Sequence, residues 1–160
     1  MGKQRQLQKA RRKNLQTIMN PSEQYAYLAG IVDGEGSLYI TKSKNKQFTA
    51  GLKIAMNDKP ALVLFQSVFG GKISKGTRKI DKRNNKLYAP AWVLQYRSHS
   101  DIKSIVRKLL PYLQVKSTQA KIILEFIELK FFPGDKFQTQ GQLNNKYIQC
   151  RAEKKRGWIK

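Results

Sequence analysis

The segment YLAGIVDGEGSLYI, residues 27–40, constrains the fold most because it requires a helix to pass directly into a strand. Its first half is apolar nearly all round, which predicts a helix buried on more than one side. We expect Gly34 and Gly36 to end that helix, and the residues after them alternate between apolar and polar as a half-buried strand does. Asp33 and Glu35, two of the ten acidic residues in the chain, therefore lie where a buried helix meets a sheet.

Helix signals recur along the rest of the chain. The first helix begins with Asn20 as its N-cap, Pro21 at its first position and Glu23 placed to close a capping box. Further helices are predicted over residues 60–69 with a glycine stop, over 100–113 with Ser100 or Asp101 as the cap and a stop before Pro111, over 117–132, and more weakly over 141–156.

Paired strands lie between these helices. Alternation predicts two antiparallel hairpins, the first from residues 37–44 and 47–56 and the second from 72–80 and 87–98. Helices interleaved with paired strands, without a βαβ pattern, indicate an α+β fold with an antiparallel sheet. One sheet face is apolar and takes the helices, and the other is polar, cationic and broad enough to lie along a duplex groove. We divide the chain into a basic N-terminal extension, a core and a basic C-terminal segment, at residues 1–19, 20–135 and 136–160.

The chain carries a formal net charge of +22, from 32 basic and 10 acidic residues. This charge opposes compaction by self-repulsion, and a polyanionic partner explains it, with nucleic acid as the leading candidate. Residues 1–20 contribute +6 and residues 141–160 contribute +5, so half of the charge belongs to the residues between them. The basic start of the chain is either an arm that lies on DNA, which we favour, or a targeting segment.

Cys150 is the only cysteine and His99 the only histidine. An internal disulfide and a cysteine-based zinc site are therefore excluded, and any metal must be held by oxygen ligands. No apolar run approaches the length of a membrane span, and no apolar segment follows the basic start. We expect a protein without a membrane or secretion signal, located in the cytoplasm of a prokaryote or in an organelle.

The acidic junction has simpler interpretations. An Asp and a Glu among glycines usually form a solvated turn, but two carboxylates on a phosphate-binding surface repel phosphate unless a divalent cation lies between them. An EF-hand is excluded because Leu38 stands where that loop needs glycine and Lys44 stands at its last position. A dinucleotide-binding loop is excluded because the third glycine is missing and the segment follows a helix.

The residues LAGIVDGEG, from Leu28 to Gly36, resemble the signature of the LAGLIDADG homing endonucleases. The order of elements over roughly residues 21–130 is similar to the core of that family, an αββαββα fold whose sheet forms a DNA-binding saddle. The motif occurs once, as in the members that act as homodimers, whereas members with two copies are monomers of about twice this length. The resemblance therefore implies a homodimer bound to double-stranded DNA.

The resemblance also implies roles for the residues of the motif. Glu35 would be the direct ligand of a divalent cation, Mg²⁺ or in its place Mn²⁺ or Ca²⁺, with help from the carbonyl of Gly34. Asp33 would have a structural or capping role near the helix end. The small residues of the helix allow a second backbone to approach closely, so the predicted dimer interface comprises Ala29, Gly30, Gly34 and Asp33.

Two further catalytic residues are implied by position. Lys116, in LPYLQVKSTQA, falls where the family commonly has a lysine that reaches the active site, although an ordinary solvated lysine remains an alternative. Met56 takes the position at which family members often have Gln, a departure from the pattern. We assign Asn57, the next residue, as its substitute.

Strand parity selects the residues of the polar sheet face, which would read base edges in the major groove while lysines of loops and tails bind phosphate. A solvated sheet face is the alternative. The selected residues are Tyr39, Thr41, Ser43, Gln47, Thr49, Lys53, Lys72, Ser74, Arg78, Gln95 and Arg97.

The sequence thus predicts a site-specific, metal-dependent DNA endonuclease that cuts a long pseudo-palindromic site and leaves 3′ overhangs, as the family does. An intron-encoded origin follows from the same resemblance. Two alternatives stay open. A maturase of the same fold would bind its intron RNA and assist splicing, and a non-catalytic basic nucleic-acid-binding protein would explain the charge but not Glu35.

Overall fold

The structure, a computed structural model, describes residues 19–45, 47–76, 79–81, 86–88, 90–131 and 136–156. Within them the predicted α+β fold is confirmed. The order of elements from helix α2 through helix α4 is αββαββα, with the second hairpin in two pieces, and two more helices follow. Arg78 and most of the basic N-terminal extension lie outside the described residues.

Helix α2 (Pro21–Glu35) has the predicted start. The Asn20 side chain accepts from the Glu23 N–H at 2.9 Å, and the Glu23 carboxylate accepts from the Asn20 N–H at 3.0 Å. Of the two glycines predicted to end it, Gly36 does so, whereas Gly34 lies within the helix. A Cβ at Gly36 would lie 2.6 Å from the Val32 carbonyl oxygen, so the direct turn from helix to strand requires a glycine there.

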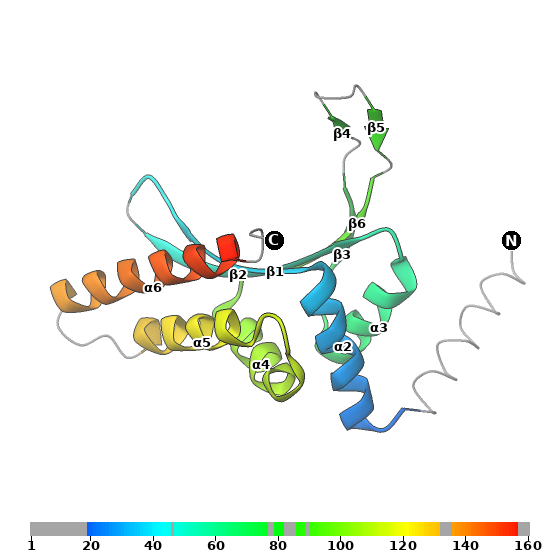
Figure 1. The fold of residues 1–160 in the computed structure, drawn as a ribbon, viewed down its shortest axis with the longest axis horizontal. Coiled ribbons are helices and arrows are strands. Elements are labelled where there is room, and N and C mark those ends of the chain that lie inside the picture. Colours follow the sequence, from blue (N-terminus) through cyan, green and yellow to red (C-terminus); the bar gives the residue numbers. More distant parts are fainter. Residues whose placement is uncertain are drawn as a thin grey trace, which may run out of the picture.

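The main sheet is antiparallel, with the order β1-β2-β6-β3. Its strands are β1 (Gly36–Lys42), β2 (Phe48–Met56), β3 (Ile73–Lys75) and β6 (Trp92–Tyr96). The second hairpin continues as a separate pair, β4 (Lys79–Asp81) with β5 (Lys86–Tyr88). The β1–β2 turn and the β4–β5 pair rise at opposite ends of the same side of the sheet, and the helices α2 to α5 lie on the other side (Figure 1). This arrangement forms a saddle.

The other helices are α3 (Lys59–Phe69), α4 (His99–Leu109), α5 (Ser117–Phe131) and α6 (Lys136–Arg156), with a 3₁₀ turn over Leu110–Tyr112. Gly70 stops α3 at a φ of 72°, which favours glycine. The predicted cap of α4 is wrong. Ser98 caps it, because β6 ends at Tyr96 and the helix begins three residues later.

The core lies between the helices and one face of the sheet. Strand parity predicted the sheet side correctly, since the alternating apolar residues of β1, β2 and β6 are buried, namely Leu38, Ile40, Phe48, Ala50, Leu52, Ile54, Leu94 and Tyr96. The helices contribute Leu28, Leu62, Ile105 and Phe126, each at most 2% exposed. Removal of this apolar surface from water stabilises the fold by about 25 cal/mol per Å².

Helix α6 is longer than the predicted 141–156 and packs against both α5 and β1. It covers the open edge of β1, where buried polar groups satisfy the strand backbone. The Gln119 amide donates to the Leu38 carbonyl at 2.8 Å and approaches the Cys150 sulfur at 3.8 Å. No helix in the described part of the chain is long and apolar enough to cross a membrane.

Candidate active site

Glu35 is the last residue of α2, and its side chain is exposed. The turn into β1 fixes its surroundings, because Gly36 pairs with Ile54 of β2. This pairing places the helix end beside the last residues of β2, which Asn57 follows. The fold therefore brings Glu35 and Asn57, both exposed, to one end of the sheet.

Asp33 has a different environment from Glu35. Its carboxylate accepts backbone N–H groups from three consecutive residues, Gln114 at 2.8 Å, Val115 at 3.2 Å and Lys116 at 2.9 Å. These donors belong to the segment that leads into α5. Asp33 therefore holds the end of α2 to the start of α5, and its oxygens are committed to that contact.

The Lys116 side chain in turn binds the backbone at the end of α2. Its Nζ donates to the Val32 carbonyl at 2.8 Å and to the carbonyl of Asp33. The Val32 carbonyl also accepts the Gly36 N–H, whereas carbonyls nearer the end of a helix lack an intrahelical partner, so the Lys116 ammonium adds a cap at the end of α2. Burial lowers the pKa of Lys116, and the negative charges of Asp33 and Glu35 oppose that change. The structure thus places Lys116 against the acidic junction.

Met56 does not project onto the polar sheet face. It shares the parity of Ile54 and packs against the core. Asn57, the next residue and the predicted substitute, is exposed.

The predicted dimer residues do not all share a face. Ala29 is 0% exposed within its own chain, so the structure corrects its assignment to the interface. The exposed small residues of α2 are Ser22, Ala26, Gly30 and Gly34, spaced four apart, and a Cβ at either glycine would meet nothing within 4 Å. Periodicity could not distinguish the two alanines because α2 is apolar nearly all round.

The polar face of the sheet carries a row of connected side chains. The Tyr39 ring lies over Gly51, where a Cβ would be 2.3 Å from it, and its hydroxyl accepts from the Gln95 amide at 2.7 Å. Arg97 donates to the Gln95 oxygen at 3.5 Å. Gly51 therefore allows an aromatic ring to lie across the sheet, a relationship that strand parity does not reveal.

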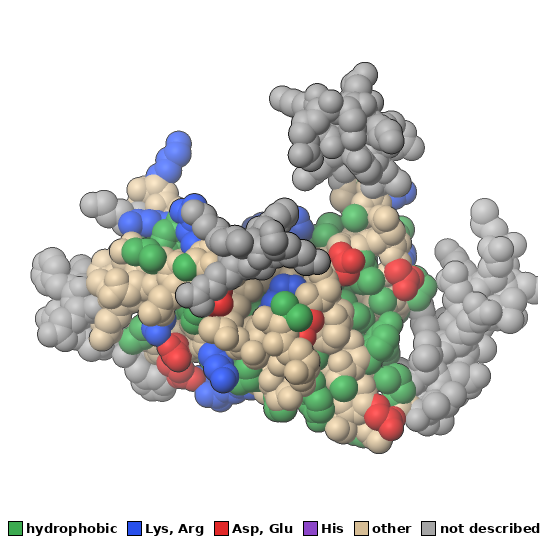
Figure 2. All heavy atoms as spheres, in the orientation of Figure 1, with side chains coloured by type: hydrophobic (Ala, Val, Ile, Leu, Met, Phe, Trp, Pro, Cys, Tyr) green, Lys and Arg blue, Asp and Glu red, His purple; other side chains and the backbone are tan. Residues whose placement is uncertain are grey.

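The other predicted sheet-face residues are exposed, namely Thr41, Ser43, Gln47, Thr49, Lys53, Lys72 and Ser74. Lys53 pairs with Ser37 on one side and with Gln95 on the other. None of the four strands of the main sheet contains an acid. Basic side chains gather around the β1–β2 turn, on the side toward which the β4–β5 pair also projects (Figure 2).

One basic residue near the junction was missed. Lys154 of α6 reaches over the edge of β1, and its Nζ lies 3.3 Å from the Ser37 hydroxyl, two residues from Glu35. The sequence shows a basic C-terminal segment but no apolar stripe that would orient α6. No signal in the sequence could have placed Lys154 there.

The oxygen groups at the junction suit a hard cation. Glu35 is an exposed carboxylate. Lys116 binds the carbonyls of Val32 and Asp33, and the carbonyl of Gly34 follows these two along the helix. Among the described residues, no three His, Cys, Asp or Glu side chains gather closely enough to hold a metal ion.

Comparison with solved structures identifies the fold as that of homing endonucleases. I-CvuI, in complex with its target in the presence of 2 mM Ca, matches with a TM-score of 0.63 and 21% identity over 83% of each chain. The archaeal intron-encoded I-Vdi141I, complexed with DNA, matches with a TM-score of 0.65 and 14% identity, over 81% of this chain and 82% of that one. I-SmaMI, bound to uncleaved DNA target with calcium ions, matches with a TM-score of 0.57 and 19% identity, over 84% of this chain and 44% of that one.

The sequence itself decides the family. The family model described as LAGLIDADG endonuclease matches residues 28–131, and the chain therefore belongs to the LAGLIDADG endonuclease family. No curated protein matches the sequence.

Proposed function

We propose that this chain is a site-specific DNA endonuclease that acts as a homodimer on a long duplex target. The observation that carries the proposal is the arrangement at the end of α2. There the exposed carboxylate of Glu35 lies beside Lys116, at one end of a sheet face whose strands contain no acid. Burial lowers the pKa of Lys116. DNA is the partner because the solved relatives I-CvuI and I-Vdi141I are complexes with DNA.

The exposed small face of α2 supports the dimer. Ala26, Gly30 and Gly34 leave open space along one side of the helix, so a second α2 can approach closely. The motif occurs once, and this chain covers 44% of the I-SmaMI chain. Two copies of α2 packed on a two-fold axis would bring two Glu35 residues together, one for each DNA strand.

The chain's own residues would hold a divalent cation through the Glu35 carboxylate and the Gly34 carbonyl, with DNA phosphates completing the ligands. Oxygen donors of this kind suit Mg²⁺, and Mn²⁺ or Ca²⁺ can occupy the same ligands. Such an ion would supply an activated water and stabilise the leaving 3′ oxygen. One cut in each strand would leave short 3′ overhangs, as the family does.

Lys116 has a defined task in this proposal. An ammonium group has three N–H donors, and two of them hold the carbonyls at the end of α2. The third is left for the scissile phosphate or the attacking water. Asp33 fixes the backbone of Lys116 while Lys116 caps the backbone of Asp33, so the Lys116 side chain is held in place before DNA binds.

The test is cleavage of a plasmid that carries the joined exon sequences flanking the gene, with Mg²⁺ and with EDTA. We expect linear product with 3′ overhangs only with Mg²⁺. Glu35→Gln is expected to lower cleavage by on the order of 100-fold or more, while Glu125→Gln, on α5 away from the junction, is expected to cleave normally. An intact plasmid combined with accelerated splicing of the intron RNA would identify a maturase instead.

A further inference from the structure

A groove of about 380 Å³ runs between the edge strand β1 and helix α6. Its β1 side is formed by residues 38–42. Its α6 side is a single helix face with residues three and four apart, made of Tyr147, Cys150, Arg151 and Lys154. The groove therefore follows the length of β1 beside the polar sheet face.

The groove is cationic. Lys42, Arg151 and Lys154 line it, and none of the described residues that line it is acidic. Their hydrogen bonds go to neutral oxygens: Lys42 to the Asn144 amide at 3.3 Å, Arg151 to the Tyr147 hydroxyl at 3.0 Å and Lys154 to the Ser37 hydroxyl at 3.3 Å. These contacts orient the cations and leave their charge available to a ligand.

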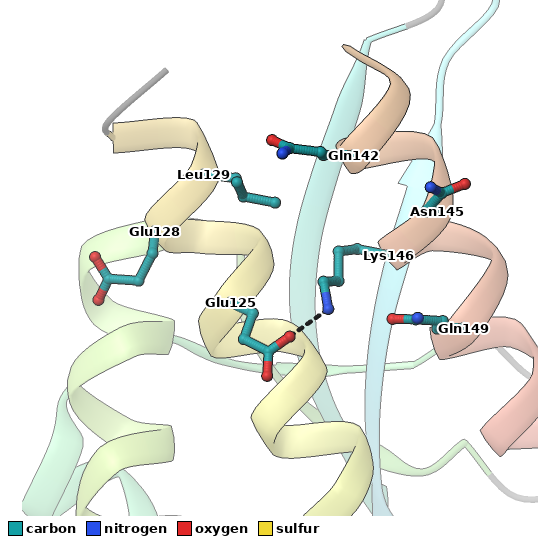
Figure 3. A pocket seen from close by; sticks show the side chains of 7 residues that line it. All are labelled: Glu125, Glu128, Leu129, Gln142, Asn145, Lys146 and Gln149. Carbon is teal, nitrogen blue, oxygen red and sulfur yellow. Dashed lines mark hydrogen bonds and ion pairs between the residues drawn. The ribbon is translucent and has the colours of Figure 1, made fainter. Parts of the chain in front are cut away.

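The opposite side of α6 is different. The groove between α5 and α6, about 580 Å³, is lined by Glu125 and Glu128, and the Lys146 ammonium that enters it forms an ion pair with Glu125 (Figure 3). Because Glu125 pairs with this ammonium group, the Lys146 charge is already neutralised and is not available to a phosphate. Among the described side chains of α6, the cations on the β1 side therefore have no acid beside them in their groove, whereas Lys146 on the other side is paired with one.

We infer that the groove between β1 and α6 binds the phosphodiester backbone of duplex DNA beside the sheet. This inference rests on the proposed function. Lys154 lies at one end of β1, beside Ser37, which is two residues from Glu35. Lys42 is the last residue of β1, at its other end. The span from residue 37 to residue 42 is about 17 Å, over which one strand of B-DNA presents about five phosphates. The groove thus leads a DNA strand toward the candidate active site.

The aromatic groups of the groove decide between duplex and single-stranded nucleic acid. A single-strand site needs ring faces on which bases stack. Tyr147 packs on Phe48 at 5.7 Å and has Arg151 over its ring at 5.6 Å, and the Tyr39 ring lies over Gly51. Tyr147 thus has two side chains against its ring and Tyr39 has one ring face against the sheet backbone, so the groove offers mainly cations for binding.

The test is the salt dependence of binding to a 30-bp duplex of arbitrary sequence in EDTA, measured by fluorescence anisotropy for the full chain. Each phosphate contact contributes about 0.9 to the slope of log affinity against log salt. We expect Lys154→Gln to reduce the slope by about 1 and the pair Arg151→Gln and Lys154→Gln by about 2. Lys146→Gln, the same charge change on the same helix but in the acidic groove, is expected to leave the slope nearly unchanged.

The outcomes distinguish a failure of the groove assignment from a failure of the proposed endonuclease function. The natural chain should bind duplex with an affinity that falls steeply with salt. If it does, but the double variant has the same salt slope as Lys146→Gln, the groove assignment is wrong while the proposed function stands. If the natural chain shows no salt-dependent duplex binding, the proposed function itself is wrong. A larger loss for single-stranded DNA of equal length than for duplex would overturn the duplex assignment. Thermal melts of each variant check that α6 remains folded.

Discussion

Asp33 and Lys116 each bind the backbone of the other with their side chains. The Asp33 carboxylate accepts the Lys116 N–H at 2.9 Å, and the Lys116 ammonium donates to the Asp33 carbonyl. The two residues are 83 positions apart, so this contact fastens the end of α2 to the start of α5. Glu35, two residues beyond Asp33, is thereby held at a fixed position while its own side chain stays exposed.

Asp33→Asn should destabilise the fold by about 2 kcal/mol, because hydrogen bonds to a charged acceptor contribute about 1.5–3 kcal/mol and the amide cannot accept all three N–H groups equally well. Urea denaturation measures the free energy of unfolding. Asp58→Asn is the control, since Asp58 is exposed and its side chain makes no capping hydrogen bond. Equal stability of the two variants would contradict the bracing role of Asp33.

Lys116→Met should lower plasmid cleavage by on the order of 10²–10³-fold, the effect of removing a preorganised donor from a reacting centre. Duplex affinity at equal salt should change far less, because the sheet face supplies most of the contacts. Lys121→Met, on the exposed side of α5, is the matched control for the loss of one charge. Normal cleavage by Lys116→Met would remove this residue from the active site.

Stability should fall as the pH decreases below about 6.5 because of His99. Its Nε2 accepts the Ala50 N–H at 3.3 Å, which requires an unprotonated nitrogen. Burial lowers the pKa of His99, with a smaller effect from the charge of Lys130. The unfolded chain therefore binds a proton more readily, and the loss extends from pH 6.5 down through the folded-state pKa. Urea denaturation between pH 7.5 and 5 should show a flatter curve for His99→Gln than for the natural chain.

Gly51→Ala should destabilise the fold by about 1–3 kcal/mol, the usual effect of overpacking, because its Cβ would meet the Tyr39 ring. The displaced ring would also lose its hydrogen bond to Gln95. Gly141→Ala is the control. Its Cβ would meet nothing within 4 Å in α6, so the better helix propensity of alanine should leave stability equal or higher. Thermal denaturation compares the two.

Gly30→Leu tests the dimer. A Cβ at this exposed position would meet nothing within 4 Å in its own chain, so the monomer should fold with normal or slightly raised stability. The approach of a second α2 would be blocked, and sedimentation at micromolar concentration should shift from two chains to one. Ala152→Leu, at an exposed position of α6, should sediment like the natural chain. A dimeric Gly30→Leu would show that α2 is not the interface.

Elements with strong local signals were predicted correctly. The capping box of Asn20 and Glu23, the glycine stop at Gly70 and the buried parity of β1 and β2 depend on residues a few positions apart. Predictions failed where local chemistry offered equal choices. Two serines and an aspartate could each cap α4, and Ser98 does so because β6 ends just before it. Gly30 and Gly34 were predicted on the exposed face of α2, but Ala29 was wrongly added to them because apolar residues surround the helix.

The sequence by itself determined the α+β class, the core face of the sheet and the acidic junction, because hydrophobic periodicity and capping residues act over short distances. Only the tertiary structure decided the different environments of the two acids. Asp33 is bound by three amides from a segment more than 80 positions away, whereas Glu35 remains exposed. It also decided that α6 lies along β1 and brings Lys154 to Ser37. Such contacts depend on how whole elements pack, and no local pattern encodes them.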